Sequence, residues 1–224
     1  MASLRIDGHD LSELKTWVEP YEVDACMVSS TAVITPEMRE QIAATGIQRI
    51  CYLDHTTPLP IRNSYSTPET LGTDRLAASV GAYFLAAELK KKHVPVLVID
   101  LGTALTFDLV TAEGEYLGGN ISPGIQMRLK ALHQFTARLP KVNPEGPLPA
   151  LGNSTETAIR CGVIHGIQRE IEGAIRQFSV NYPQLLVFLT GGDTLDFAKP
   201  LKKHIFADKF LVAKGLNIIL MHNS

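Results

Sequence analysis

The hydrophobic residues of the first half fall into short runs that alternate with a helical pattern. Apolar runs at 25–28 and 47–53 have the length of strands, and a helical segment lies between them. A Thr-Pro pair at 35–36 is suited to cap this helix and begin it. A shorter helix is predicted at 11–18, with Asp10 as its N-cap. Strand, helix and strand in this order indicate a parallel β-α-β unit and an α/β protein.

The second half predicts a longer series of strands, introduced by an alanine-rich helix at 74–92. From Val94 the pattern gives a strand, a Gly-Thr turn, a second strand, a turn at Gly114 and a third strand. The segment before the helix, 56–70, contains three prolines and is predicted as a loop. The remaining elements are predicted in the order helix, helix, strand and helix: 125–136, 155–180, 185–189 and from 213 onward.

Composition and charge are those of an ordinary globular protein. The chain has 224 residues, of which 45% are hydrophobic and 20% charged, and a formal net charge of −2. This balance gives no general attraction to nucleic acid or to an anionic membrane, so neither is expected as a partner. Three cysteines lie far apart, which fits neither a metal site nor a disulfide framework. With no predicted membrane span and no signal-peptide pattern, we expect a cytoplasmic protein of one large or two small domains.

One run of residues combines buried strands with groups that bind phosphate. Between 96 and 108 an apolar strand ends at Asp100, Gly102 and Thr103 form a turn, and a second apolar strand follows. Glycine lets a phosphate approach the backbone N–H groups closely, with the Thr103 hydroxyl beside it. Asp100 is placed to hold a cation or a water molecule. An ordinary hairpin with a Gly-Thr turn has the same pattern, so both interpretations stay open for this run alone.

The start of the alanine-rich helix is a second candidate, with the sequence Gly72-Thr73-Asp74-Arg75. The helix macrodipole stabilises the anion of Asp74, which from this position reaches a substrate hydroxyl as a general base. A helix N-cap has the same residue type at the same place. Arg75 either binds substrate or pairs with a neighbouring carboxylate, and Gly72 allows a ligand to approach the backbone.

These two stretches belong to a larger set of motifs. Four spaced motifs occur in a fixed order along the chain: 72–78, 96–108, 118–124 and 189–193. Together they resemble the type III pantothenate kinase family, within the superfamily of sugar kinases, Hsp70 and actin. The resemblance extends from Tyr65 to the C-terminus, and more weakly from Val23.

The resemblance implies an α/β fold of two RNase H-like lobes, as in actin-like ATPases. The first lobe would comprise 1–92 and the second 93–224, with the helix at 74–92 as the bridge between them. Members of the family begin with a strand, an Asp-x-Gly-Asn-Ser/Thr turn that grips the ATP phosphates, and a second strand. The Asp-Gly pair at 7–8 follows no apolar strand and does not match this turn. We therefore expect the first lobe to be truncated at its N-terminus, with an unpaired strand edge.

The activity that the resemblance implies is ATP-dependent phosphorylation of pantothenate to 4′-phosphopantothenate, a step towards coenzyme A. ATP would arrive with Mg²⁺, and a monovalent cation, K⁺ or NH₄⁺, would assist. Members of the family are homodimers with active sites at the subunit interface. The unmatched turn also fits a second hypothesis, a catalytically impaired homologue that binds a ligand or acts as a regulatory accessory protein.

The resemblance also assigns roles to single residues. Asp74 would be the catalytic base that takes the proton from the primary hydroxyl of pantothenate, and Asp100 would be the ligand of the monovalent cation. Two pairs would contact ATP, the first at the phosphates and the second at the adenosine: Gly102 with Thr103, and Gly191 with Gly192. The substrate-binding residues would surround the base, with one more on a later helix: Tyr65, Gly72, Thr73, Asp74, Arg75 and Thr155.

Two of these assignments have a purely structural alternative. Tyr65 is also suited to pack under the proline-rich loop at 56–70. Thr155, or Ser154 before it, would also serve as the N-cap of the helix that follows.

Overall fold

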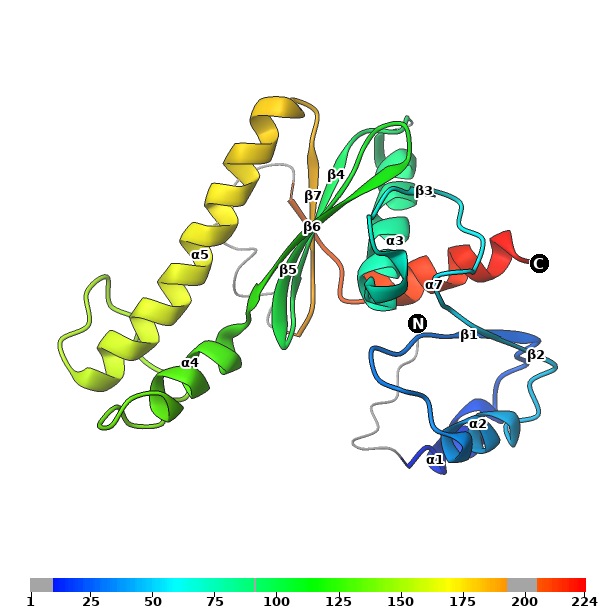
Figure 1. Ribbon diagram of the computed structural model, residues 1–224, viewed down its shortest axis with the longest axis horizontal. Coiled ribbons are helices and arrows are strands. Elements are labelled where there is room, and N and C mark those ends of the chain that lie inside the picture. Colours follow the sequence, from blue (N-terminus) through cyan, green and yellow to red (C-terminus); the bar gives the residue numbers. More distant parts are fainter. Residues whose placement is uncertain (1–9, 91, 193–204) are drawn as a thin grey trace.

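Two sheets of unequal size organise the chain in the computed structural model (Figure 1), which describes residues 10–90, 92–192 and 205–224. The smaller sheet has two parallel strands, β1 (Ala25–Val28) and β2 (Arg49–Tyr52). The helix α2 (Pro36–Ala43) connects them, and Thr35 Oγ1 accepts a hydrogen bond from the N–H of Met38 at its start. The predicted parallel β-α-β unit is thus confirmed.

The first helix, α1 (Glu13–Val18), begins two residues later than predicted and contacts α2. Its N-cap position is occupied by Ser12, so the prediction of Asp10 as the N-cap is wrong. Asp10 instead accepts a hydrogen bond from the Ser12 N–H at 2.9 Å and another from the Gln41 amide at 3.0 Å. The side chain of Asp10 therefore joins α1 to α2 rather than capping a helix.

The larger sheet has six strands in the order β3-β6-β5-β4-β7-β8. In chain order these are β3 (Arg62–Asn63), β4 (Val96–Leu101), β5 (Ala104–Val110), β6 (Glu115–Pro123), β7 (Leu186–Thr190) and β8 (Ile205–Ala207). The strands β4, β5 and β6 are antiparallel neighbours, whereas β7 and β8 run parallel to β4, and β3 runs parallel to β6. The molecule is therefore an α/β protein with a mixed sheet.

Helices cover both faces of the larger sheet (Figure 1). On one face lie α3 (Thr73–Lys90) and α7 (Leu211–His222), which form one hydrophobic core with it. On the other face lie α4 (Ile125–Gln134) and α5 (Thr155–Asn181), which form a second core. None of the helices in the described part of the chain is long and apolar enough to cross a lipid bilayer.

Alternation along the central strands divides their side chains between the two cores. In β4, Val98 belongs to the core under α3 and Ile99 to the core under α5. In β7 the same division separates Phe188 from Leu189. All four side chains are at most 1% exposed. Because successive side chains of a strand point to opposite faces, a continuous apolar run is what a strand buried on both faces requires.

Two glycines bring α3 and α7 into backbone contact. A Cβ on Gly215 would lie 1.7 Å from the carbonyl oxygen of Ala77, and a Cβ on Gly81 would lie 2.5 Å from that of Leu211. Any larger residue at either glycine would therefore push the two helices apart.

The start of α3 lies at the junction between the small sheet and the larger one. The hydroxyl of Thr73 is 2.8 Å from that of Ser29, which follows β1. At the other end of the chain, Arg49 Nη2 of β2 donates a hydrogen bond to Ser224 Oγ at 2.7 Å. The helix α7 also contacts β1. The small sheet is thus attached to both helices that cover one face of the larger sheet.

Short elements account for most of the differences from the sequence prediction. The segment 56–70, predicted as a loop, contains β3 and a 3₁₀ helix, η1 (Pro68–Thr70). The three-residue strand β8 was not predicted, and the last helix begins at Leu211 rather than at 213. Strands of two or three residues carry too little periodicity to be recognised.

Candidate active site

The first turn of α3 holds Asp74, at the helix start that the sequence predicts. Its Oδ1 accepts a hydrogen bond from the backbone N–H of Arg75 at 2.8 Å, and the side chain is half-buried. A Cβ on Gly72 would lie 2.6 Å from this oxygen. Glycine at 72 therefore leaves the space that the carboxylate occupies, close to the positive end of the helix dipole.

Asp100 lies near the end of β4, in the centre of the larger sheet. In the register of the sheet it stands opposite Thr106 of β5 and Thr190 of β7. The turn that follows is closed by the N–H of Gly102, which donates to the carbonyl oxygen of Ala104 at 3.1 Å. This Gly-Thr turn between β4 and β5 is confirmed.

Negative charge accumulates around Asp100. Burial, together with the charges of Asp74 and Asp108, raises the pKa of Asp100 to about 6. The charge of Asp74 thus acts on Asp100, although 26 positions separate their numbers in the sequence (100 − 74). A buried carboxylate with a raised pKa, such as Asp100, is typical of a site that receives a cation or a proton.

Glycines lie closely around the same strand ends. Gly191, which follows β7, has φ +99°, and a Cβ there would lie 2.6 Å from Asp100 Oδ1. A Cβ on Gly124 would lie 2.4 Å from the carbonyl oxygen of Gly102. Gly192 is exposed, and a Cβ there would meet no atom of the described residues within 4 Å. The predicted nucleotide residues Gly102 and Gly191 thus converge on Asp100.

Arg75 is buried in an ion pair rather than open to solvent. Its Nη2 donates to Asp108 Oδ1 at 2.7 Å, and its Nε lies 3.1 Å from the same oxygen. The two side chains are 7% and 1% exposed. Burial alone would lower the pKa of Arg75, but the hydrogen bonds and charge of Asp108 more than offset this, so the pKa lies above its ordinary value. Pairing with a carboxylate is one of the two roles that the sequence left open; contact with substrate stays a prediction.

Tyr65 lies beside this ion pair. Its ring centroid is 5.8 Å from the guanidinium carbon of Arg75 and 6.2 Å from the ring centroid of Tyr116. Gly118 has φ +106°, and a Cβ there would lie 3.1 Å from the Tyr65 ring. Tyr65 is therefore half-buried against β6 and beside Arg75, and the predicted packing under the proline-rich loop stays a prediction.

The comparison with known proteins decides the family. The family model described as type III pantothenate kinase matches residues 9–177. The chain belongs to the type III pantothenate kinase family. A type III pantothenate kinase of Phocaeicola vulgatus is 49% identical over 219 residues, which cover 98% of this chain and 88% of that protein. One of Bacteroides fragilis is 49% identical over 217 residues, which cover 97% and 87%.

The fold has a solved counterpart. A Baf family protein from Campylobacter jejuni has a crystal structure that aligns with a TM-score of 0.60 and 23% identity, covering 94% of this chain and 88% of that one. At this identity the likeness concerns the fold alone. The sequence relatives of this type III pantothenate kinase family member are kinases, that is, phosphotransferases.

In this family member Thr155 stands apart from the residues described so far. It is exposed in the first turn of α5, on the face of the sheet opposite α3 (Figure 1). The N-cap is Ser154, whose side chain accepts a hydrogen bond from the N–H of Thr157 at 3.2 Å. Thr155 also lines a largely apolar groove of about 860 Å³ between α4 and α5. The structure therefore does not bring Thr155 to Asp74 within one chain.

Two polar residues near the site escaped the sequence analysis. Thr106 is 8% exposed, and its Oγ1 makes no hydrogen bond to the described residues. Tyr116 is fully buried, and its hydroxyl donates to Asp108. For Thr106 the available signal was a hydroxyl two positions before Asp108 in a strand that is otherwise apolar. Among the residues that the structure describes, no group of three or more histidines, cysteines or carboxylates is arranged to hold a metal ion by itself.

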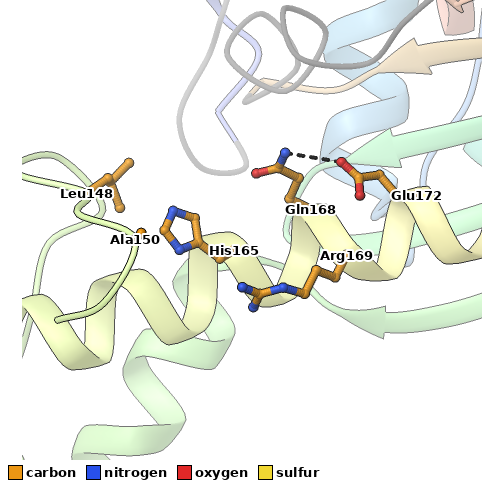
Figure 2. A pocket seen from close by; sticks show the side chains of 6 residues that line it. All are labelled: Leu148, Ala150, His165, Gln168, Arg169 and Glu172. Carbon is orange, nitrogen blue, oxygen red and sulfur yellow. Dashed lines mark hydrogen bonds between the residues drawn. The ribbon is translucent and has the colours of Figure 1, made fainter.

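A second hollow, of about 400 Å³, lies along the middle of α5 (Figure 2). His165, Gln168 and Glu172 line it from the helix, with Leu148 and Ala150 on the loop opposite. Gln168 Nε2 donates a hydrogen bond to Glu172 Oε1 at 3.2 Å, so part of its polar lining is internally paired. None of the predicted site residues lies in this hollow.

Proposed function

We propose that this chain transfers the γ-phosphoryl group of ATP to the primary hydroxyl of pantothenate. The observation that carries the proposal is the placement of Asp74 at the start of α3 and of Asp100 near the end of β4, where the charge of Asp74 contributes to the raised pKa of Asp100. A base beside a carboxylate that receives cations is the arrangement that phosphoryl transfer needs, because the protein mainly positions the acceptor and neutralises charge. Membership of the type III pantothenate kinase family supports the substrate.

Asp74 acts as the general base. Its carboxylate accepts the proton of the primary hydroxyl while the hydroxyl oxygen forms a bond to the γ-phosphorus and the bond to the leaving ADP oxygen breaks. The hydrogen bond from the Arg75 N–H holds Oδ1 in place, so the other oxygen, Oδ2, is available for the proton. Tyr65, Gly72, Thr73 and Arg75 bind pantothenate around this base.

The nucleotide lies between the two glycine-containing turns. Gly102 and Thr103 contact its phosphates, and Gly191 and Gly192 its adenosine. The glycines fit such a ligand, since a Cβ on Gly102 would lie 3.3 Å from Asp100 Oδ1 and would narrow the approach. Mg²⁺ comes with ATP, held through phosphates and water rather than by a cluster of protein ligands.

A monovalent cation, K⁺ or NH₄⁺, binds at Asp100 and neutralises phosphate charge. Two observations support the fit. The pKa of Asp100 is raised to about 6 by burial and by neighbouring carboxylates, so a cation is favoured beside it. The unsatisfied Oγ1 of Thr106 belongs to the residue opposite Asp100 in the sheet and supplies a second oxygen ligand.

The active site is completed by a second copy of the chain. A homodimer would bring Thr155 of one subunit to Asp74 of the other, which explains why Thr155 is on the opposite face of the sheet. The groove at Thr155 supports this arrangement, because Leu132, Ile159 and Val163 line it and Phe135 at its edge is 86% exposed. An exposed aromatic ring beside an apolar groove is characteristic of a protein interface.

We also propose that the chain folds as two RNase H-like lobes. Three antiparallel strands followed by two parallel ones support an RNase H-like lobe at 93–224. The β1-α2-β2 unit is the corresponding part of a first lobe within 1–92. An ATP-dependent step of this kind takes place in the cytoplasm.

The alternative, an impaired homologue with a ligand-binding or regulatory role, is not favoured. The similarity to the type III pantothenate kinase of Phocaeicola vulgatus covers 98% of this chain and 88% of that protein.

The test is a direct assay of the purified protein. ADP release is followed with pantothenate, ATP, Mg²⁺ and K⁺, and the product is identified by its mass. We expect pantothenate-dependent ADP release and a product heavier than pantothenate by one phosphoryl group. Absence of that product at saturating substrates, from a folded protein, would refute the proposed function.

A further inference from the structure

Tyr116 lies behind the candidate active site without being open to it. Its side chain is 0% exposed in β6, and its Oη donates a hydrogen bond to Asp108 Oδ1 at 2.6 Å. Burial and the charge of Asp108 raise the pKa of the Tyr116 hydroxyl above its ordinary value. The phenol therefore stays protonated and remains a donor wherever the protein is folded.

Asp108 in turn fixes one edge of the Arg75 guanidinium. Oδ1 receives Nη2 at 2.7 Å and Nε at 3.1 Å, and Oδ2 lies 3.2 Å from Nε. All three bonds use the Nε–Nη2 edge of the guanidinium, so Nη1 takes no part in the pair. Because Tyr116 binds the same Oδ1, it prevents the carboxylate from rotating and keeps the guanidinium in one orientation.

Tyr116 also supports the second predicted substrate residue on this side. Its ring centroid is 6.2 Å from that of Tyr65, and the two ring planes are tilted by 48°. The Tyr65 ring lies beside Arg75, with 5.8 Å between the ring centroid and the guanidinium carbon. One buried side chain therefore contacts both Asp108, which holds Arg75, and Tyr65.

We propose that Tyr116 is a positioning residue for substrate binding, which acts through Asp108 to present the Nη1 edge of Arg75 to the carboxylate of pantothenate. This inference rests on the proposed function. A guanidinium group pairs best with a carboxylate when the orientation of the planar guanidinium is fixed. The carboxylate of pantothenate lies at the opposite end of the molecule from the hydroxyl that reacts. Tyr116 therefore affects ground-state and transition-state binding alike, which appears in KM rather than in kcat.

The test compares two tyrosine-to-phenylalanine variants. Tyr116→Phe removes the hydroxyl that binds Asp108. Tyr83→Phe is the matched control. Tyr83 lies in α3, about two helical turns after Arg75, and is 6% exposed. Its hydroxyl donates to the carbonyl oxygen of Ala112 at 3.1 Å. Each variant loses one hydroxyl from the same hydrophobic core.

Tyr116→Phe should raise the KM for pantothenate roughly tenfold, as expected for a lost hydrogen bond to a charged group. Its kcat and its KM for ATP should stay within about threefold of the wild type, since the reacting groups are untouched. Tyr83→Phe should leave all three constants within about twofold. An unchanged KM for pantothenate in a folded Tyr116→Phe, a fall in kcat alone, or an equal effect of Tyr83→Phe would overturn the proposal.

Asp108→Asn, assayed by calorimetric titration with pantothenate, provides a second variant if Tyr116→Phe does not fold. It removes the charge that holds Arg75, so we expect weaker pantothenate binding with the heat of ATP binding retained; unchanged pantothenate binding would contradict the role. The activity of the wild type distinguishes a failure of the proposed function from a failure of the proposed role of Tyr116. If the wild type has no pantothenate-dependent ADP release, the proposed function fails; if it is active and Tyr116→Phe behaves like it, only the role of Tyr116 fails.

Discussion

Gly191 lies so close to Asp100 that a Cβ on the glycine would stand 2.6 Å from the carboxylate oxygen Oδ1. The same Cβ would lie 2.4 Å from the carbonyl oxygen of Leu101. The ends of β4 and β7 therefore meet at a point where only glycine fits. The backbone φ of +99° at Gly191 also favours glycine, because other residues rarely adopt a positive φ. The position of Asp100 depends on a residue that follows a different strand.

Gly191→Ala should displace Asp100 and abolish most activity. The left-handed backbone and the clash with backbone atoms should also lower the free energy of unfolding by roughly 1–2 kcal/mol or more. Urea denaturation and the ADP-release assay measure the two effects. The matched control is Gly173→Ala in α5, because no atom of the described residues outside its own helix lies within 4 Å of a Cβ there. Equal behaviour of the two variants would contradict the close fit at Gly191.

Asp74→Asn should lower kcat by roughly 10²- to 10⁴-fold, because it keeps the shape of the side chain and removes the base. Pantothenate binding, measured by calorimetry, should largely survive. Asp24→Asn, an exposed aspartate before β1, controls for the loss of one negative charge. Turnover of Asp74→Asn within a few-fold of the wild type would mean that Asp74 is only a helix cap.

Activity should require K⁺ or NH₄⁺, and the concentration of K⁺ needed for half-maximal rate should rise as the pH falls through about 6, the pKa of Asp100. Protonation removes the charge that binds the cation. Steady-state rates measured against K⁺ at several pH values check this. Equal rates in sodium-only and potassium buffers would exclude the cation role.

The same pKa has a consequence for stability. The pKa of Asp100 rises from 3.8 to about 6 on folding, so the folded state binds the proton more tightly and stability falls as the pH rises from about 4 to 6. The loss at neutral pH amounts to at most roughly 3 kcal/mol. Without K⁺, Asp100→Asn should not show this decline, which denaturation curves at pH 4.5 and 7 would reveal. A decline of the same size in Asp100→Asn would attribute it to other groups.

Mixing Asp74→Asn chains with Thr155→Ala chains tests the shared site, given that each variant is inactive alone. In a mixed two-fold dimer one site carries both changes and the other carries neither. Random exchange of subunits should therefore restore about a quarter of the wild-type sites. Subunits that exchange, as seen by mass spectrometry of labelled chains, yet show no activity would contradict a site shared between Asp74 of one chain and Thr155 of the other.

Local patterns were enough to predict most of the fold. The Thr35 cap, the parallel β1-α2-β2 unit and the hairpin of β4 and β5 all depend on residues close in sequence. The strands β3 and β8 were missed because they are short edge strands, defined by pairing with distant β6 and β7. Nothing within 62–63 or 205–207 marks that pairing.

The site divides in the same way. Motifs placed Asp74 at a helix start and Asp100 at a strand end, which each depend on neighbouring residues. The partner of Arg75 is 33 positions away, and a charge pattern alone does not specify which carboxylate it meets. Tyr116 was missed because nothing in the sequence around it shows that its hydroxyl donates to Asp108, eight positions away on the neighbouring strand β5.

The glycine contact between α3 and α7 also constrains the order of folding. The apolar side of α3 is made early in synthesis, together with β4 and β5, but its partner helix is encoded far downstream at 211–222. A growing chain on the ribosome therefore carries an uncovered face of α3 while α4, α5 and β7 are being translated. Ribosome-bound intermediates of this protein are expected to need a chaperone at that face until α7 closes over Ala77 and Gly81.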